Sequence, residues 1–534
     1  MPSSPLLISL PNGLSTSGIT SWAVRLANTL VARGSKAGLI LHAPPPHHAP
    51  LHFPLDPRVR LFDLSHLQPL SQTPGRVERF IPHYRDAIQA LASTTPAILS
   101  PNLLGDDYAI AAALSQSLPD RLRIVGWLHN DIPYEYHLQR HYAPLISAFV
   151  PVSQRIHATL LARLPASRHS DIHRIPYGLD IPRLPTPRPP LAGRPLRLVY
   201  SGRLDESQKR VLCLPYLSRE LTSRGIHHQL AILGDGPAAA DLARLCAGID
   251  HIHLCGPCTP PQVQSILQRA DIFLLPSRHE GLSVAAIEAL AQGCVPILTS
   301  LASGSDELVQ PSVSGFLVPS TPDDQGQPLA LAMADAVCHA LPNLPALSQA
   351  AHARAQSLFS LASHADAVEA LLRNVIHSPP RPWPTSQPCA FGGHPGQSHA
   401  ASGSVPEGAA QRLTDLLHSL QGRRLLVHGT GRHTLELAGT FAAHGHNIVA
   451  FTDDDPAKHN TRLWGWPVLS PHDPTLPTLA TDVIISSWIN QAAILARRDL
   501  YERHGLQVHA LYPHNTSTNE PEAPARVSQT TQRP

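Results

Sequence analysis

The sequence predicts an α/β protein built from three Rossmann-like domains, and three observations indicate this fold class. Short apolar runs alternate with stretches of helical periodicity, which is the pattern of parallel strands joined by helices. Glycine-containing or charged loops follow several of these runs, at the strand ends where α/β proteins place their ligands. A segment dense in Pro, Gly, Ser and His separates the last domain from the two before it.

The length of 534 residues is enough for about two to four domains. Segments rich in Pro, Gly and polar residues mark the boundaries, because they cannot bury enough apolar surface to fold. We therefore expect an N-terminal Rossmann-like domain at 1–190, a second Rossmann-like domain at 191–376, a disordered linker at 377–410, an accessory Rossmann-like domain at 411–515 and a disordered tail at 516–534.

The bulk composition argues against several classes of function. The formal net charge is +2, from 41 basic and 39 acidic residues, so the chain lacks the basic excess of a nucleic-acid-binding protein. The 33 His are scattered without a metal-binding motif, and the lone CxxC of Cys255 and Cys258 lacks the second pair that zinc requires. We therefore expect no nucleic-acid partner and no bound metal.

The sequence carries no charged-then-apolar leader at its start and no apolar run of about 18 residues. We therefore expect a cytoplasmic protein. The sequence leaves open a peripheral association with the inner face of a membrane, and it does not determine the oligomeric state.

The stretch at 271–293 organises the second domain. It predicts a buried strand, a polar loop, and a helix that begins after Ser283 and ends at Gly293. Glu280 lies in the loop and Glu288 on the helix. A sugar nucleotide needs such an arrangement, because its sugar hydroxyls and its ribose diol each bind a carboxylate, and its diphosphate binds N–H groups at a helix start. Those N–H groups would belong to Gly281, Leu282 and Ser283.

A second stretch supplies positive charge. The predicted strand at 196–200 is followed by Arg203 and Lys209, six positions apart. A diphosphate carries about two negative charges, and removing them from water is costly unless cations and N–H groups replace the hydration. Lys209 is informative because the chain has only two other lysines, Lys36 and Lys458.

These stretches together resemble the glycosyltransferases of family 4, the retaining, NDP-sugar-using enzymes of the GT-B fold. The strand, the Glu-Gly, the Ala-rich helix and the following Gly-Cys-Val-Pro-Ile are similar to the family's E-x7-E stretch. The loop with Arg203 and Lys209 is similar to its G-R-x5-K-G stretch, with Arg210 in place of the last Gly. The resemblance covers residues 1 to about 376, with landmarks in the family's order: Arg203, Lys209, Gly234, Glu280, Glu288, Glu307 and Gly315.

The resemblance implies a donor site in the cleft between the first two domains, mainly against the second, and a last helix (361–376) that crosses back to the first. It implies a catalytic set in which two cations neutralise the diphosphate, a carboxylate orients the sugar and a histidine closes the site: Arg203, Lys209, Glu280 and His129. It implies donor binding by Glu288 at the ribose and by loop residues: Gly13, Gly18, Gly234, Gly281, Leu282 and Ser283. Two further positions depart from the family's pattern, Tyr177 for its Asn and Ser303 for the first Gly before Glu307.

The third domain begins with another strand, glycine turn, helix and strand. Gly429 and Gly431 lie in the turn, and Asp453 follows the next strand roughly 20 residues later. This order fits a nucleotide-binding unit, with the glycines at a phosphate and Asp453 at a ribose diol, although Thr434 replaces the third glycine. It resembles the small Rossmann-like units appended to sugar methyltransferases and polysaccharide-biosynthesis enzymes. Nucleotide binding and a purely structural role both stay open.

The leading hypothesis is a retaining glycosyltransferase that moves a sugar from an NDP-sugar to a hydroxyl acceptor, in cell-surface glycan or polysaccharide biosynthesis. The resemblance implies no cofactor besides the NDP-sugar donor and no metal. Two alternatives stay open: a sugar-nucleotide epimerase on the same architecture, and a non-catalytic sugar-nucleotide-binding protein. The sequence identifies neither the donor's base and sugar nor the acceptor.

Overall fold

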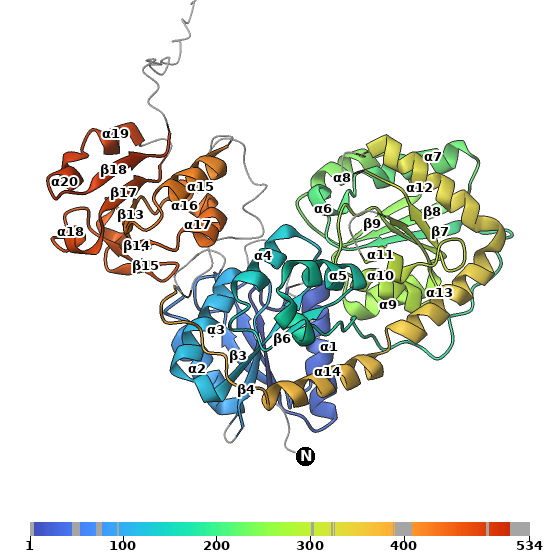
Figure 1. Cartoon of the computed structure of the whole chain (residues 1–534). Helices are drawn as coiled ribbons and strands as arrows, with labels where there is room; N and C mark the ends of the chain where they lie inside the picture. The colour runs from blue at the N-terminus through green and yellow to red at the C-terminus, as the bar shows by residue number, and fades with distance from the viewer. Residues whose placement is uncertain are drawn as a thin grey trace, which may run out of the picture. The chain divides into compact units, whose positions relative to one another are not determined.

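The computed structural model describes residues 5–15, 17–44, 54–70, 77–92, 95–300, 304–321, 324, 326–387, 389, 408–487 and 491–512. The chain separates into two compact units, residues 1–398 and 399–534. Unit 1 contains two six-stranded sheets and unit 2 contains a third (Figure 1). The α/β class with three Rossmann-like sheets is therefore confirmed.

The first sheet of unit 1 has the strand order β3-β2-β1-β4-β5-β6, with all neighbours parallel. Strands β1 and β2 are buried at every position, which explains why they read as continuous apolar runs. The strands are β1 (Leu6–Leu10), β2 (Ala37–His42), β3 (Arg60–Leu64), β4 (Ala97–Ser100), β5 (Leu122–Leu128) and β6 (Ala148–Pro151). The helices among them are α1 (Gly18–Ala32), α2 (Ile81–Leu91), α3 (Gly105–Ser117), α4 (Pro133–His141) and α5 (Gln154–Arg163).

The second sheet has the order β12-β11-β10-β7-β8-β9 and is also parallel throughout. Its strands are β7 (Leu196–Ser201), β8 (His228–Leu233), β9 (Ile252–Gly256), β10 (Ile272–Leu275), β11 (Val295–Thr299) and β12 (Phe316–Val318). Its helices are α6 (Glu206–Lys209), α7 (Cys213–Ser223), α8 (Ala239–Cys246), α9 (Pro260–Arg269), α10 (Val284–Ala291), α11 (Ser305–Leu308), α12 (Gly326–Ala340), α13 (Leu344–Leu358) and α14 (Leu361–Ile376).

Both sheets of unit 1 follow the same doubly wound order. The chain builds outward from β1 in one direction and then continues with β4 on the other side, and β7 and β10 have the same relation in the second sheet. At such a switch point the loops after two neighbouring strands diverge, which opens a crevice at the carboxyl edge of the sheet. The topology therefore points to the loops after β7 and β10 as a ligand site.

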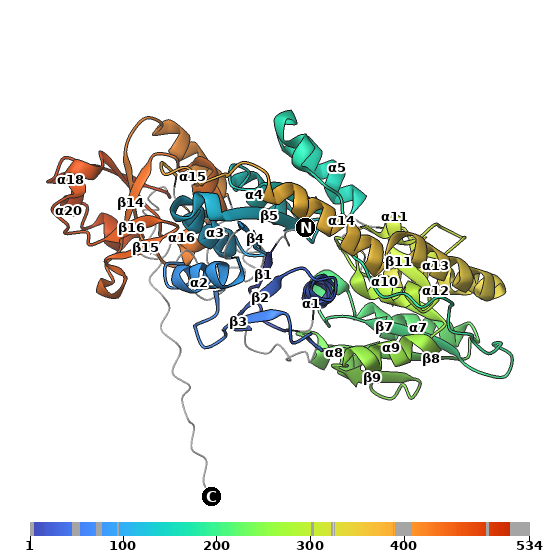
Figure 2. The ribbon, with the colours of Figure 1, turned by 90° about the horizontal axis from the view of Figure 1, so that it is seen from below.

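Helix α14 returns from the second half of unit 1 to the first, as the resemblance implied. The indole N–H of Trp22 on α1 donates to His364 Nε2 at 3.2 Å, and Arg33 pairs with Asp366 at 2.6 Å. Figure 2, seen from below, shows α14 and α1 in the same part of unit 1. These contacts tie the two halves of unit 1 together.

Residues 378–387 correct the prediction of a disordered linker at 377–410. Trp383 is only 1% exposed, its backbone N–H donates to Ser115 Oγ at 2.9 Å, and its ring centroid lies 5.1 Å from that of Tyr142. Burying one large aromatic side chain contributes about 3 kcal/mol, which orders a short segment despite its proline-rich composition. The rest of the predicted linker, apart from residues 377, 389 and 408–410, and the predicted tail at 516–534 lie outside the described residues.

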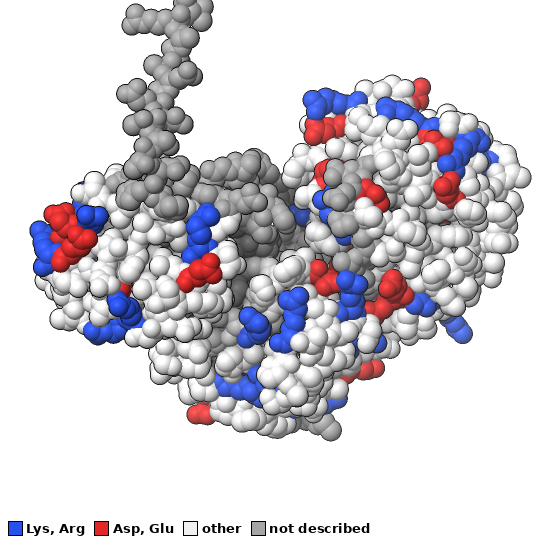
Figure 3. Space-filling view, turned by 45° about the horizontal axis from the view of Figure 1, so that its top comes forward, with Lys and Arg blue, Asp and Glu red and all other residues white. Residues whose placement is uncertain are grey.

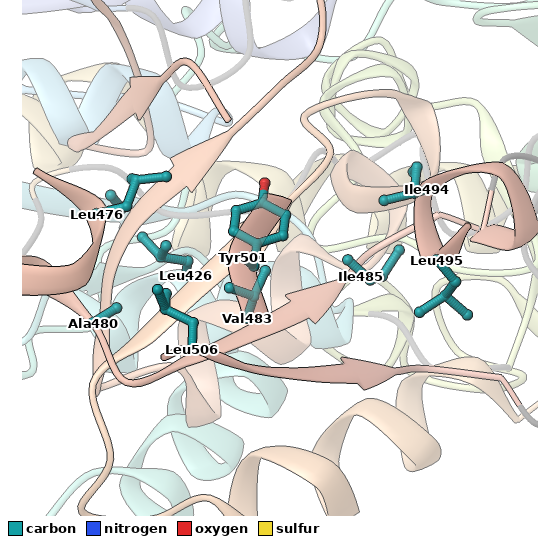
Figure 4. Close-up of a cluster of buried hydrophobic side chains, with 10 residues drawn as sticks. Leu426, Leu476, Ala480, Val483, Ile485, Ile494, Leu495, Tyr501 and Leu506 are labelled. Atoms are coloured by element: carbon teal, nitrogen blue, oxygen red, sulfur yellow. The ribbon is translucent and has the colours of Figure 1, made fainter. Parts of the chain in front are cut away.

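Unit 2 carries a sheet of order β15-β16-β14-β13-β17-β18, parallel except for the β15–β16 hairpin. Figure 4 shows its core, where Leu426, Val483 and Ile485 from the central strands pack with Tyr501. The strands are β13 (Leu425–His428), β14 (Ile448–Thr452), β15 (Thr461–Leu463), β16 (Trp466–Leu469), β17 (Asp482–Ile485) and β18 (Gln507–Ala510). The helices are α15 (Ala409–Ser419), α16 (Arg432–Glu436), α17 (Ala438–His444), α18 (Leu476–Leu479), α19 (Gln491–Leu495) and α20 (Asp499–Glu502).

Candidate functional site

The loops after β7 and β10 bring two predicted site residues into contact. Lys209 is the last residue of α6, and Glu280 lies in the loop before α10. Lys209 Nζ forms an ion pair with Glu280 Oε1, and the Ser277 hydroxyl donates to the same oxygen at 2.6 Å. The two charged side chains are 15% and 11% exposed. A cation and a carboxylate therefore meet at the switch point, and Glu280 Oε2 points to no hydrogen-bond donor among the described residues.

Arg203 lies in the same loop as Lys209 but does not join this ion pair. Its side chain is 49% exposed, and its Nη2 lies 3.3 Å from Asp205 Oδ2 and donates to Gln208 Oε1 at 2.9 Å. Gln208 in turn donates to the carbonyl oxygen of His279 at 3.3 Å. The guanidinium of Arg203 therefore stands at the rim of the site, linked to it through one side chain and open to an anion.

Helix α10 begins at this site. Ser283 is its N-cap and accepts a hydrogen bond from Ala286 N at 3.3 Å, as the sequence predicts. Gly281, Leu282 and Ser283 thus present their backbone at a helix N-terminus, which favours an anion. A Cβ on Gly281 would lie 1.8 Å from the carbonyl oxygen of His129, so only glycine fits where the two halves of unit 1 meet.

The other predicted glycines also lie where another part of the chain comes close to their backbone. Gly18 begins α1, and a Cβ there would come 3.2 Å from Val284 at the start of α10. Gly13 has φ +58° and Gly234 has φ +133°, and an added Cβ would come within 2.6 Å and 1.9 Å of a carbonyl oxygen. These contacts account for all three glycines by packing, and their contact with a donor stays a prediction.

Glu288 on α10 reaches the first half of unit 1. Arg25 Nη2 on α1 lies 2.5 Å from Glu288 Oε1, and the two side chains are 25% and 23% exposed. The other terminal nitrogen of Arg25, Nη1, is buried and finds no hydrogen-bond partner among the described residues. A ribose diol at Glu288 would therefore share the carboxylate with an arginine that the sequence analysis did not identify.

His129 follows β5, and both of its ring nitrogens are occupied. Nε2 lies 2.8 Å from Asn102 Oδ1, so it carries the proton, and Nδ1 accepts from the Tyr177 hydroxyl at 2.7 Å. Burial lowers the pKa of His129 to about 3, so the ring is neutral. A hydrogen bond from this imidazole to a sugar would require one of these interior bonds to break.

Three residues that support His129 were missed by sequence reasoning as site residues. Asn102 follows β4, which is buried throughout. A polar side chain directly after a buried strand is the sequence feature that could have identified it. Tyr177, which departs from the family's Asn, supplies the hydroxyl at Nδ1. Glu135 on α4 accepts the backbone N–H of His129 at 2.7 Å and that of Asn130 at 3.0 Å, and its burial raises its pKa to about 7.

Glu307 crosses between the halves of unit 1 as well. Its carboxylate accepts the backbone N–H of Gln154 at the start of α5, and its Oε2 lies 2.8 Å from Arg174 Nη1. Glu307, which the resemblance aligns with a family motif, therefore joins the two halves of unit 1 in this chain. The departure at Ser303 lies outside the described residues.

Charge is dispersed on the visible face of the molecule. Figure 3 shows Lys and Arg beside Asp and Glu in small mixed groups, in keeping with the net charge of +2. Among the described residues, no group of three or more His, Cys, Asp or Glu is placed to hold a metal ion. Within the same residues, every helix is too short or too polar to cross a bilayer.

In unit 2 the glycine turn after β13 is hydrogen-bonded to Asp453, the acidic residue that was predicted to bind a ribose. Asp453 Oδ2 accepts from Thr430 N at 2.8 Å and Oγ1 at 2.5 Å and lies 3.0 Å from Lys458 Nζ, and its Oδ1 accepts from Asp455 N at 3.0 Å. Burial would raise the pKa of Asp453, but these bonds prevail and lower it to about 2. Its oxygens are therefore engaged within the turn, so the predicted ribose contact would require an exchange of partners.

The glycines of this turn differ from each other. Gly429 has φ +105°, and a Cβ there would come 2.9 Å from the carbonyl oxygen of Ser486, whereas Gly431 has open space around it. Thr434, in the place of a third glycine, donates to the Gly429 carbonyl at 2.7 Å. Side-chain bonds thus fill part of the region that a dinucleotide would use in a glycine-rich turn.

Comparisons with known families and with curated proteins both give matches. Residues 195–343 match the family model "Glycosyl transferases group 1". The chain is 32% identical over 167 residues to the putative colanic acid biosynthesis glycosyltransferase WcaL of Salmonella typhimurium, covering 30% of this chain and 40% of the relative. It is 34% identical over 135 residues to the amylovoran biosynthesis glycosyltransferase AmsK of Erwinia amylovora, covering 24% and 33%. The chain thus spans well under two thirds of these relatives.

Solved structures match over more of the chain. A sucrose-phosphate synthase from Thermosynechococcus elongatus aligns with a TM-score of 0.55 at 18% identity, over 70% of this chain and 98% of that one. The Anabaena protein Alr3699/HepE in complex with UDP-glucose aligns with a TM-score of 0.52 at 16% identity, over 69% and 99%. At this level of identity the likeness shows the fold, which is the GT-B arrangement of two Rossmann-like domains.

Proposed function

We propose that this chain, a GT-B protein whose residues 195–343 form a glycosyl transferases group 1 domain, transfers a sugar from an NDP-sugar to a hydroxyl acceptor. The observation that carries the proposal is the Lys209–Glu280 pair at the β7/β10 switch point. Arg203 at the rim and the N-terminus of α10 lie in the same loops. This set matches the two ends of an activated sugar, since one end is an anion and the other is hydroxylated.

The leaving diphosphate would be held by positive charge and by N–H groups. Lys209 and Arg203 would neutralise it, and the backbone of Gly281, Leu282 and Ser283 would bind it at the start of α10. Charge develops on the diphosphate as the glycosidic bond breaks, so preorganised donors lower the barrier to departure. Lys209 is already fixed by Glu280, which reduces the reorganisation needed during the reaction.

The sugar would bind at Glu280 and the ribose at Glu288. Glu280 Oε1 is occupied by Lys209 and Ser277, which leaves Oε2 to accept a sugar hydroxyl. Glu288 would accept a hydroxyl of the ribose diol while Arg25 holds it from α1. His129 would close the site through its carbonyl, which lies against Gly281, with its ring buried behind.

The finer features of the reaction are part of the same proposal. We assign retention of the anomeric configuration, no cofactor beyond the donor, and an acceptor in glycan or polysaccharide synthesis; relatives named for colanic acid and amylovoran biosynthesis support that acceptor class. We place the protein in the cytoplasm, with peripheral association at the inner membrane face. Separation of cell lysate into soluble and membrane fractions, with and without a salt wash, tests that placement.

A donor screen tests the function. The wild-type chain is incubated with UDP-, GDP-, ADP- and dTDP-sugars, and thermal stabilisation and NDP release are measured. A donor at 100 times its Kd stabilises the fold by about 2.7 kcal/mol. NMR of the product then reads the anomeric configuration. Release of an epimerised sugar nucleotide without acceptor would indicate the epimerase alternative, and binding without turnover would indicate the non-catalytic one.

A further inference from the structure

Arg210 is a buried charge in an unusual backbone conformation. It follows Lys209 as the C-cap of α6, with φ +50° and ψ +41°, and it is 0% exposed. Its guanidinium donates to the carbonyl oxygens of Pro276 at 2.7 Å and Ser277 at 3.0 Å. On its other side it donates to Ser320 Oγ at 2.9 Å and to the carbonyl oxygens of Thr321 at 3.2 Å and Asp324 at 3.0 Å.

Both features of Arg210 are costly in isolation. A left-handed backbone costs a non-glycine residue about 1 kcal/mol, and glycine would adopt it freely. A guanidinium taken out of water costs more unless its donors are satisfied. Here five acceptors satisfy it, and none of them is a carboxylate, so its hydrogen bonds are directed at loops rather than at a counter-charge. The surroundings therefore fix this side chain in one position.

The loops that Arg210 joins carry the proposed donor site. Pro276 and Ser277 begin the loop that ends in Glu280, and the Ser277 hydroxyl donates to Glu280 Oε1. The same loop is tied to the α6 turn at two more places, by Arg278 N to Gln208 O at 2.6 Å and by Gln208 Nε2 to His279 O at 3.3 Å. Arg210 binds the start of this loop, at Pro276 and Ser277, and connects it to the segment after β12.

We propose that Arg210 is a positioning residue of the donor site, which holds Ser277 and through it the Glu280 carboxylate in register with Lys209. The proposal rests on the proposed function, because Glu280 is the group being positioned. A glycine at this position would suit the backbone but would leave the Pro276 carbonyl without its donor and the Ser277 carbonyl with the Thr299 hydroxyl alone. In this chain the α6 turn and the loop after β10 are therefore joined through a side chain.

The proposal predicts a separation of kcat from donor binding. Two of the three proposed diphosphate ligands, Arg203 and the start of α10, make no hydrogen bond to the Arg210 side chain, so KM for the donor should change less than threefold. Without Arg210, Glu280 would be displaced by a fraction of an ångström to about 1 Å, and misplacement of that size costs up to about 100-fold in rate. We therefore expect Arg210→Met to lower kcat by about 10- to 100-fold.

Arg123 offers a matched control. It is also buried and also donates to backbone carbonyls, Ser378 O at 2.8 Å and Leu122 O at 2.9 Å, but it lies near the amino end of β5 in the first sheet. Arg123→Met should lower the melting temperature and leave kcat unchanged. If Arg210→Met lowered kcat no more than Arg123→Met, or if it raised KM at constant kcat, the positioning role would be overturned.

Two further variants keep the test open if Arg210→Met fails to fold. Arg210→Lys keeps the charge but loses the fork of donors, so it should recover part of kcat. Ser277→Ala removes the link to Glu280, and its effect on kcat should be less than additive with that of Arg210→Lys. Full additivity would show that Arg210 does not act through Ser277.

Hydrogen exchange separates this proposal from the proposed function. In the full chain, Arg210→Lys should speed amide exchange over residues 276–280, and Arg123→Lys should not. If the wild type showed no sugar transfer but this exchange pattern held, the donor chemistry would be wrong and the positioning correct. If transfer occurred but exchange at 276–280 were unchanged in Arg210→Lys, the positioning role would be rejected.

Discussion

Two lysine–carboxylate pairs lie beyond parallel strands in this chain, and they are built differently. Lys209 pairs with Glu280 in unit 1, and Lys458 pairs with Asp453 in unit 2. Both hydrogen bonds to Glu280 from the described residues end on Oε1. Asp453 accepts hydrogen bonds on both of its oxygens, with Thr430 and Lys458 on one and Asp455 on the other. Both pairs therefore lie at the carboxyl edge of a sheet, but only Glu280 keeps an oxygen without a hydrogen bond from the described residues.

The source of the restraint differs too. Glu280 is oriented from outside its own loop, by Lys209 and, through Ser277, by Arg210. Asp453 is used as a restraint itself, because it holds the turn at Thr430 in place. Glu280, which other residues orient, keeps Oε2 for a substrate, whereas Asp453, which restrains the turn, uses both of its oxygens. Under the proposed function, this contrast assigns Lys209–Glu280 to the reaction and Lys458–Asp453 to the structure of the turn.

The largest expected effect is the loss of the unit 1 pair. Lys209→Met and Glu280→Gln should each lower kcat by about 1,000-fold, or about 4 kcal/mol, because a preorganised charge beside the reacting bond is removed. Lys458→Met is the control and should leave kcat within twofold. Circular dichroism checks that each variant folds. An equal loss of kcat in Lys458→Met would break the comparison.

Substitution of one glycine gives the next largest effect, and a second glycine provides the control. Gly281→Ala would place a Cβ 1.8 Å from the His129 carbonyl oxygen, so the two halves of unit 1 cannot keep their present contact. We expect kcat/KM to fall by about 100-fold, since displacement of about 1 Å has that cost. Gly431→Ala in unit 2 meets open space at φ −83° and should change neither activity nor melting temperature. Steady-state kinetics with the donor that the screen identifies provide the measurement.

Unit 2 should lose stability at low pH through Asp453. Its pKa is lowered from 3.8 to about 2, so the folded state binds this proton less tightly than the unfolded state. The stabilisation is therefore fully present above about pH 4 and is lost as the pH falls toward 2, with a magnitude of at most about 2 kcal/mol. Hydrogen exchange over 425–469 in the full chain measures it. Asp453→Asn should flatten this pH dependence, and an unchanged profile would contradict the assignment.

The buried strands could be predicted from the sequence, whereas only some of the edge strands could. Strands β1, β10 and β11 are buried at every position and read as apolar runs. Strands β3 and β18 were missed because they lie at sheet edges, where exposed positions carry polar residues and break the apolar pattern. Trp383 was missed for the opposite reason, since one buried aromatic residue lies in a segment whose composition is that of a linker.

The candidate site divides in the same way. The order of Arg203, Lys209 and Glu280 along the chain, with a strand before each loop, was enough to predict that they gather at one sheet edge. Contacts between segments far apart in sequence could not be predicted from local pattern, such as Glu307 with Gln154 and Asn102 with His129. The left-handed backbone at Arg210 could be suspected from the family's glycine, but the acceptors of its guanidinium could not.

The smallest expected effect concerns the pair that joins the halves of unit 1. Arg25 and Glu288 are each about one quarter exposed, and such pairs contribute at most about 1 kcal/mol. We expect Arg25→Met to raise the donor KM by about three- to fivefold with kcat unchanged, because Glu288 loses the group that orients it toward a ribose. Arg33→Met removes a comparable ion pair, with Asp366, away from the site and should change neither constant. A lower KM in Arg25→Met would contradict this and would mean that Arg25 competes with the donor for Glu288. In that case the KM difference between the wild type and Arg25→Met should be smaller for 2′-deoxy donors than for ribose donors.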